Sequence, residues 1–405
     1  MRKIIQNIKK NKELYLIALH LGLTGYGGAA VIDKIKNEYV TKRNIISERK
    51  YLHVLSLSQI LPGSSLINLI AFFSYLKAGL IGSIIGTTIY IFPTFVITVL
   101  FSDFYFRYSN IQHIGVFIHS LNILLVSLLI NALFSLGKTI FIREKIIDYR
   151  SIVISILCFY LYFFYGLNIM SIILISGILG IVLYVFTGFF SVAKHDLHVI
   201  NEPFFKRKKA WAILSISLIF FSALLFGISE PLWILFSSFL KIGTLAFGGG
   251  IAAIPLIEAA FVKNLHLFTP TQFWDGISIS QITPGPIMIV SAFFGYKIAG
   301  IVGAFVATIG MCVPSVFLII IVGKIHERIK DNPIVRGVIR GFLAGFIGVL
   351  ITLIVGQMQR SLLDRFSILL AITTFGLLAK IRNGFLISLL VCIVYSISLI
   401  LLKVA

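Results

Sequence analysis

One motif of the chain is written twice. Residues 56–63 read Ser-Leu-Ser-Gln-Ile-Leu-Pro-Gly and residues 278–285 read Ser-Ile-Ser-Gln-Ile-Thr-Pro-Gly, with six of the eight positions identical. A glycine motif upstream is duplicated too, because Gly22-x-x-x-Tyr26-Gly27-Gly28 recurs 221 residues later as Gly243-x-x-x-Phe247-Gly248-Gly249. The chain therefore holds two copies of one unit, in which helix-breaking Gly and Pro interrupt apolar sequence at matched places.

The composition is that of a membrane protein. Hydrophobic residues make up 58% of the chain and charged residues 12%, and the mean hydropathy is +1.02. A helix of about 20 apolar residues crosses a bilayer, and runs of that kind recur along the chain. We therefore expect an all-α polytopic membrane protein with apolar segments near 14–32, 51–76, 79–102, 112–136, 146–165, 168–192, 211–228, 231–255, 273–297, 300–323, 334–357, 366–380 and 384–403.

The repeats divide the chain into three parts. We expect a first repeat at 1–193, a basic cytoplasmic linker at 194–210, and a second repeat at 211–405 with an extra leading helix. The net charge of +20 lies in short loops, which indicates the positive-inside rule and attraction to anionic lipid rather than nucleic acid. The three single cysteines, the absence of metal-ligand spacing among the histidines and the absence of a P-loop predict no disulfide, metal or cofactor.

Loop charges separate two topologies. If all thirteen segments cross from a cytoplasmic N-terminus, loop 33–50, with six cations, faces outside, and the equivalent loop 256–272, with only Lys263, faces inside. Both loops obey the positive-inside rule if the Gly-broken and Pro-Gly-broken segments are re-entrant hairpins. We favour the hairpins. In either topology the repeats are inverted, because seven segments separate each segment from its copy.

The broken segments are the predicted binding site. Glycine permits positive φ and close backbone approach, and a Pro can open a half-helix whose free N–H groups and dipole favour an anion. The alternative is that Gly and Pro only kink packed helices, but the duplication of both motifs argues against it. The predicted substrate-binding residues here are Gly25, Tyr26, Gly27, Gly28, Gln59, Pro62, Gly63, Ser64, Phe247, Gly248, Gly249, Gln281, Thr283, Pro284 and Gly285.

Two cations within the spans join this predicted site. Lys241 stands six residues before Phe247 and matches His20 of the first repeat. Arg340 lies one turn inside its span and matches His119. A charge within a span needs a partner or a function, and cations near half-helix N-termini indicate an anionic substrate. The alternatives are an interhelical hydrogen bond for Lys241 and snorkelling to the interface for Arg340.

Acidic residues are scarce in the spans. Glu258 and Asp275 flank the second broken pair, and we interpret them as helix caps, with a proton relay as the alternative. No GxSxG motif, HExxH motif or pair of intramembrane Asp residues is found, so an intramembrane enzyme is disfavoured. A membrane scaffold would not need duplicated broken helices.

The motifs resemble those of the chromate ion transporter (CHR) family in its long, two-domain form. That family carries a Gly-x-Thr/Ser-x-Phe-Gly-Gly block and a Gln-x-x-Pro-Gly-Pro block in each half. The chain departs from it at three positions, since His20 stands where the family usually has Lys, Tyr26 replaces Phe, and Ser64 replaces the second Pro. The matching residues are Gly22, Thr24, Gly27, Gly28, Gln59, Pro62, Gly63, Lys241, Gly243, Phe247, Gly248, Gly249, Gln281, Pro284, Gly285 and Pro286.

The resemblance implies efflux of chromate, a tetrahedral dianion similar to sulfate. The sequence is thus interpreted as a multi-pass secondary transporter of the plasma membrane that exports an oxyanion, driven by the membrane potential or by exchange with sulfate or protons. A transporter or channel for a different anion or solute is the alternative. The expected partners are the oxyanion and the lipid bilayer; a homodimer is compatible with the sequence, and no nucleic acid is expected.

Overall fold

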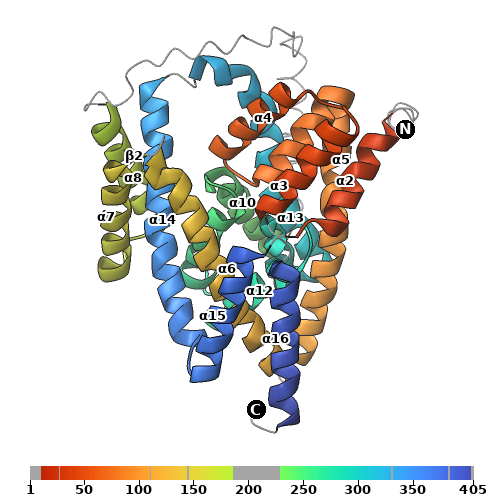
Figure 1. The fold of residues 1–405 in the computed structure, drawn as a ribbon, viewed down its shortest axis with the longest axis vertical. Coiled ribbons are helices and arrows are strands. Elements are labelled where there is room, and N and C mark those ends of the chain that lie inside the picture. The colour runs from red at the N-terminus through yellow and green to blue at the C-terminus, as the bar shows by residue number, and fades with distance from the viewer. Residues whose placement is uncertain are drawn as a thin grey trace.

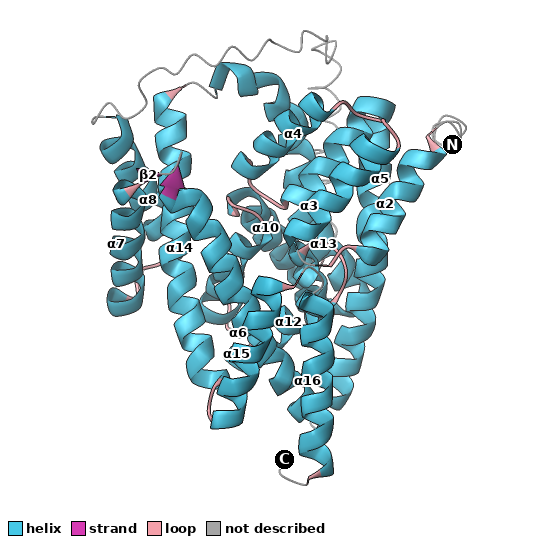
Figure 2. Cartoon of the chain, in the orientation of Figure 1, coloured by secondary structure: helices cyan, strands magenta, loops and turns pink. Residues whose placement is uncertain are grey.

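The computed structural model describes residues 11–26, 28–109, 111–143, 146–185, 229–329, 332–381 and 384–402. These residues are almost entirely helical (Figure 2). Within the described ranges the strands are limited to the two-residue β1 (Ile142–Arg143) and β2 (Ile146–Ile147), which form a short antiparallel ladder. The predicted linker and the predicted extra helix 211–228 lie outside the described residues.

The two halves of the chain build corresponding long helices in the same order (Figure 1). The first half contains α2 (Lys12–Thr24), α3 (Gly28–Lys36), the π-helix η1 (Asn37–Lys42), α4 (Glu48–Ile60), α5 (Ser65–Tyr108), α6 (Gln112–Phe141), α7 (Tyr149–Tyr165) and α8 (Ile169–Val185). The second half contains α10 (Glu230–Leu245), η2 (Gly250–Ala252), α11 (Ala253–Ile257), η3 (Glu258–Asn264), α12 (Pro270–Ile282), η4 (Ile287–Ile289), α13 (Val290–Ile329), α14 (Pro333–Ser361), α15 (Arg365–Lys380) and α16 (Gly384–Leu401). In the described residues the short 3-10 helices η2 and η4 occur in the second half.

The long helices have the length and composition of membrane spans. In the described part of the chain, five helical stretches are long and apolar enough to cross a bilayer: Ser65–Tyr108, Gln112–Phe141, Ile287–Ile320, Pro333–Ser361 and Gly384–Leu401. Large apolar side chains cover the outer surface, among them Phe134, Leu174, Phe366 and Leu390, each at least 60% exposed. An exposed apolar surface of this kind suits contact with lipid. The prediction of an all-α polytopic membrane protein is confirmed.

The segment broken at the first glycine motif folds back on itself. Arg43, just after η1, places its Nη1 2.9 Å from Oε1 of Glu13 in the first turn of α2. An exposed ion pair of this kind contributes little stability, but the contact shows that Glu13 and Arg43 lie side by side. The residues are 30 positions apart, so the chain reverses between α2 and α3, and both ends of this hairpin lie on one side of the molecule.

Each Pro-Gly motif also lies at the bend of a helical hairpin. The rings of Tyr51 and Phe73 are 6.0 Å apart between centroids, and these residues stand equally far on either side of Pro62. In the second half, a Cβ added to Gly276 of α12 would lie 2.4 Å from the ring of Phe293 in α13. Helix α4 and the start of α5, like α12 and the start of α13, are therefore antiparallel pairs.

Helices α5 and α13 contain a second reversal at matched glycines. Gly79 has φ 69° and Gly300 has φ 58°, a conformation that only glycine adopts readily. Ser83 Oγ donates to the carbonyl oxygen of Ala71 at 2.8 Å, across a separation of 12 residues. A straight helix would hold such residues about 18 Å apart. A short helix therefore runs from each Pro-Gly bend to this turn, and a long helix follows it.

The two halves interlock through their last helices. Helices α7 and α8 of the first half pack on α14 of the second, whereas α15 and α16 of the second half pack on α6 of the first (Figure 1). Glycines along one face of α14 make the first contact close: a Cβ on Gly341 would lie 2.0 Å from the carbonyl oxygen of Ser176, and one on Gly348 would lie 2.3 Å from that of Ser155. Small residues at helix crossings are the usual means of close packing in membranes.

Candidate functional site

The Pro-Gly bends interrupt helices at the same place in both halves. Helix α4 ends at Ile60, and Gly63 then adopts φ 93° before α5 begins at Ser65. Helix α12 ends at Ile282, and Gly285 adopts φ 108° before η4 begins at Ile287. The Pro in each bend lacks an N–H and cannot continue the helical ladder, while the Gly supplies the positive φ that the reversal requires.

Each bend pairs with the glycine motif of the other half. The N–H of Gly63 donates to the carbonyl oxygen of Ala246 at 3.0 Å, and the N–H of Gly285 donates to that of Gly25 at 2.7 Å. Pro62 and Phe247 form an isolated antiparallel bridge. A Cβ added to Gly250 would lie 3.0 Å from Cβ of Ile287 just after the second bend, so the two pairs also touch. The four broken segments, two from each repeat, meet in one place, which we call the junction. Non-helical backbone at membrane depth is tolerated where other protein segments bury it in this way or where it lines a cavity.

The glycine motif of the second half faces the start of α5. Gly248 has φ 94° and Gly249 has φ 96°, after which η2 begins at Gly250. A Cβ added to Gly249 would lie 3.9 Å from Oγ of Ser65, the first residue of α5. In the first half, Gly28 begins α3, and Gly27 lies outside the described residues. Helix starts from both halves therefore border the junction, and such N-termini favour negative charge.

Small hydroxyl residues of α5 and α13 pack against the two Pro-Gly bends. Thr94 Oγ1, on α5, donates to the carbonyl oxygen of Pro284 at 2.5 Å. Its counterpart 221 residues later is Ser315, whose Oγ is buried and has no hydrogen-bond partner among the described residues. A Cβ added to Gly285 would lie 2.3 Å from Thr94 Oγ1, and one added to Gly63 would lie 2.0 Å from Ser315 Oγ. The bends therefore have no room for a side chain at either glycine.

The structure describes the side chains of most of the remaining predicted residues of the motifs. Tyr26 stacks on Phe385 of α16 with ring centroids 5.6 Å apart, and Phe247 packs on Phe342 of α14 at 5.2 Å. Ser64 caps α5, its side chain accepting from the N–H of Ile67. Thr283 Oγ1 donates within its own helix to the carbonyl oxygen of Ser280, Gln281 is partly exposed in the last turn of α12, and the side chain of Gln59 lies outside the described residues.

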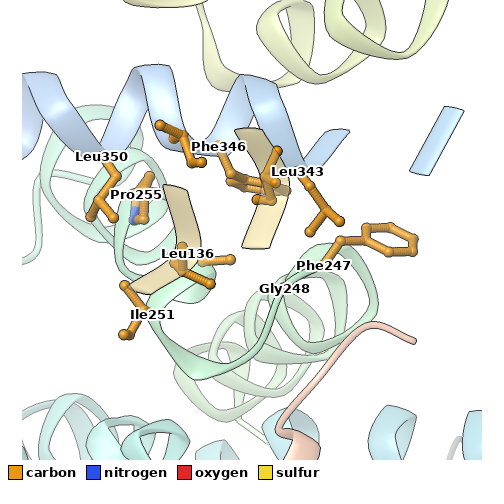
Figure 3. Close-up of a pocket in the computed structure, with 11 residues that line it drawn as sticks. Leu136, Phe247, Gly248, Ile251, Pro255, Leu343, Phe346 and Leu350 are labelled. Atoms are coloured by element: carbon orange, nitrogen blue, oxygen red, sulfur yellow. The ribbon is translucent and has the colours of Figure 1, made fainter. Parts of the chain in front are cut away.

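A small apolar pocket lies beside the junction (Figure 3). Its volume of about 20 Å³ has room for roughly one water molecule. Apolar side chains from three different parts of the chain surround it, including Leu136, Phe247, Ile251, Leu343 and Phe346. A polar ligand needs hydrogen-bonding groups around it, so this pocket is not itself an anion site.

Lys241 stands apart from the junction's hydrogen bonds. It is exposed on α10, and its ammonium forms no ion pair or hydrogen bond with the described part of the chain. Its counterpart His20 is also exposed, on α2. The interhelical hydrogen bond considered as an alternative for Lys241 is therefore not found among the described residues, and its role in anion binding stays a prediction.

Arg340 is engaged with an acid that the sequence analysis did not single out. Its Nη1 donates to Oδ2 of Asp148 at 2.8 Å. The hydroxyl of Tyr184 donates to the same oxygen at 2.5 Å, and Ser151 Oγ lies 3.2 Å from it. Asp148 is almost completely buried, with a side chain 1% exposed, and that of Arg340 is 22% exposed. Arg340 therefore neither joins the junction nor snorkels freely, because it neutralises a buried carboxylate.

Sequence comparison identifies the family of the chain. The sequence profile described as "Chromate transporter" matches residues 12–181 and 233–397. The chain belongs to this family. It is therefore a membrane transporter, and the resemblance drawn from the paired motifs is confirmed. The two matched stretches fall on either side of the predicted linker.

Relatives match along most of the chain. An uncharacterized transporter of Methanocaldococcus jannaschii is 27% identical over 385 residues, which cover 93% of this chain and 92% of the relative. A chromate transport protein of Cupriavidus metallidurans is 22% identical over 374 residues, covering 92% and 88%. A chromate transport protein of Pseudomonas aeruginosa is 26% identical over 322 residues, covering 79% and 74%. No solved structure matches the chain.

Proposed function

We propose that the protein is a secondary transporter that exports a tetrahedral oxyanion, chromate or the similar dianion sulfate, across the plasma membrane. The observation that carries the proposal is the reciprocal pairing of the broken helices, in which Gly63 bonds to Ala246 and Gly285 bonds to Gly25. This pairing gathers the N-terminal ends of helices from both repeats, the part of a helix that favours an anion. The relatives named chromate transport proteins support chromate as the substrate.

We assign the anion contacts to backbone N–H groups and small polar side chains of the bends and glycine motifs. Ser64, Ser65 and Thr283 offer neutral hydroxyls near the bends, and Lys241 would attract the anion from the exposed face of α10. Arg340 is left out of this assignment because its charge is paired with Asp148. No cofactor, metal or catalytic group takes part in the proposal, which is one of transport and not of an enzyme.

The membrane potential alone can drive such export. A dianion leaving a cell with an inside-negative potential of about 100 mV gains about 4.6 kcal/mol, since each charge contributes about 2.3 kcal/mol. Neither ATP nor a coupling ion is then required, although exchange with sulfate or protons would also drive the cycle.

Counterflow in proteoliposomes tests the proposal. Vesicles preloaded with unlabelled sulfate, or with chromate, should transiently concentrate labelled sulfate from a dilute outside solution. A transporter with alternating access produces this overshoot, whereas a channel only equilibrates the label. Vesicles without protein serve as the control. A lack of uptake with both anions, together with uptake of another solute, would establish the alternative substrate class.

The hairpin topology predicts which loops face the cytoplasm. We propose that the N-terminus and residues 33–50 are cytoplasmic and that 256–272 are extracytoplasmic. Thr41 and Asn264 are exposed and suit cysteine substitution in a background without the buried Cys158, Cys312 and Cys392. In intact cells an impermeant thiol reagent should label Asn264→Cys but not Thr41→Cys. The reverse pattern would exclude the hairpin topology.

A further inference from the structure

Asp275 is a buried carboxylate in the middle of α12, and it is only 5% exposed. It does not cap the helix as expected, because the N-cap is Thr269, which forms a capping box with Gln272. The hydroxyl of Tyr105 donates to Oδ2 of Asp275 at 2.8 Å, and Nδ2 of Asn122 donates to Oδ1 at 2.7 Å. The carboxyl group therefore joins α12 to α5 and α6.

No cation forms an ion pair with Asp275 in the described part of the chain. Asp275 is the one ionisable side chain of α12, and His119 on α6 is close enough to interact with it electrostatically, as it does with Asp364. The charges on the other helices packed against α12 are engaged elsewhere: Asp103 with Arg107 on α5, Glu258 with Lys263 on η3, and Lys297 of α13 with Gln272 and the carbonyl oxygen of Leu267.

The hydrogen bonds around Asp275 suit both of its protonation states. A carboxylate within a membrane protein is costly without a cation beside it, which favours the neutral acid. Two neutral donors, however, lower the cost of the charged form. The hydroxyl of Tyr105 can donate to a carboxylate or accept from a carboxylic acid, so the same arrangement holds either state without moving a heavy atom.

The helices that hold Asp275 also hold a Pro-Gly bend. Helix α12 carries Asp275 and ends in the bend at Thr283–Gly285. Helix α5 contacts both ends of this stretch, since Tyr105 bonds to Asp275 and Thr94 bonds to the carbonyl oxygen of Pro284. Ser278 Oγ, one turn after Asp275, donates to Oδ1 of Asn122 at 2.6 Å. A change at Asp275 thus acts on the elements that position the bend.

We propose that Asp275 is a proton-binding site whose protonation promotes binding of the oxyanion at the junction. This inference rests on the proposed function. Protonation removes a negative charge from the low-dielectric surroundings of the anion, which strengthens anion binding. Linkage is reciprocal, so the bound anion also strengthens proton binding. The step only adds a proton to the carboxylate of Asp275 or removes it, and no further reactant is needed.

Sulfate binding to the purified full-length protein, measured by calorimetry from about pH 5 to about pH 8, tests the inference. Sulfate is the probe because it stays a dianion over this range, whereas chromate takes up a proton. The wild-type affinity should rise about tenfold on acidification, a typical coupling. Asp275→Asn should hold the high affinity at every pH. The matched control Asp103→Asn, which removes the partly exposed acid on α5, should keep the wild-type pH dependence.

The outcomes separate this inference from the proposed function. The inference would be overturned if Asp275→Asn keeps the wild-type pH dependence of sulfate binding. It would also be overturned if His119→Gln loses that pH dependence and Asp275→Asn does not. Either result would leave anion transport in place. If Asp275→Asn does not fold, Asp275→Glu takes its place. Its longer side chain should keep the pH dependence but displace its midpoint, and an unchanged midpoint would overturn the inference. If the wild-type protein binds neither sulfate nor chromate at any pH, the proposed function itself fails.

Discussion

Gly285→Val should reduce oxyanion counterflow to the level of vesicles without protein. Gly285 adopts φ 108°, which a β-branched residue avoids. A Cβ at this position would also lie 2.3 Å from Thr94 Oγ1, so the bend would have to move. Such a movement would break the bond from the N–H of Gly285 to Gly25 that joins the two halves.

The same reasoning applies to the first repeat. Gly63 has φ 93°, and an added Cβ would lie 2.0 Å from Ser315 Oγ. Gly63→Val should therefore be as severe as Gly285→Val if both bends form one site. Transport that survives the change at Gly63 but not the change at Gly285 would assign the site to the second half alone.

The matched control is Gly376→Val on α15. Gly376 lies within a regular helix, and an added Cβ would meet no atom within 4 Å. This variant should transport at the wild-type rate at equal protein per vesicle. Comparable thermal unfolding of all three variants in detergent would show that the losses at the bends concern the site and not the fold.

Much of the fold followed from the sequence because its signals are local. Positive φ at Gly63, Gly248, Gly249 and Gly285 follows from the conformational freedom of glycine in apolar sequence, and the duplicated motifs predicted matched breaks. The fold-back of α2 on α3 agrees with the hairpins inferred from the cations of loop 33–50. Each of these inferences needed only neighbouring residues and the cost of placing charge in a bilayer.

The pairing between the halves depends on contacts far apart in the chain. No local signal shows that Gly63 bonds to Ala246, or that α7 and α8 pack on the other half. Arg340 was predicted to bind the anion because the sequence does not reveal a partner for its charge. That partner, Asp148, lies 192 residues away in a loop without a distinguishing motif. Asp275 was interpreted as a cap because the sequence does not reveal that Tyr105 and Asn122 surround it.

The Asp148–Arg340 pair should dominate the stability of the interface between α14 and the helices α7 and α8. Arg340→Gln leaves a buried carboxylate without its cation, and removing one partner of a buried pair typically costs about 3 to 5 kcal/mol. We expect the free energy of unfolding to fall by about 3 kcal/mol or more, because the side chain of Asp148 is only 1% exposed. Chemical denaturation in detergent would measure this loss.

The double variant Asp148→Asn with Arg340→Gln distinguishes a structural role from a role in transport. Removing both charges eliminates the uncompensated carboxylate, so the double variant should regain most of the stability that Arg340→Gln loses. Tyr184 and Ser151 can still bond to the amide that replaces Asp148. If the double variant is stable and transports normally, Arg340 acts only by neutralising Asp148. A stable double variant that no longer transports would return Arg340 to the anion pathway, as its place within a span first indicated.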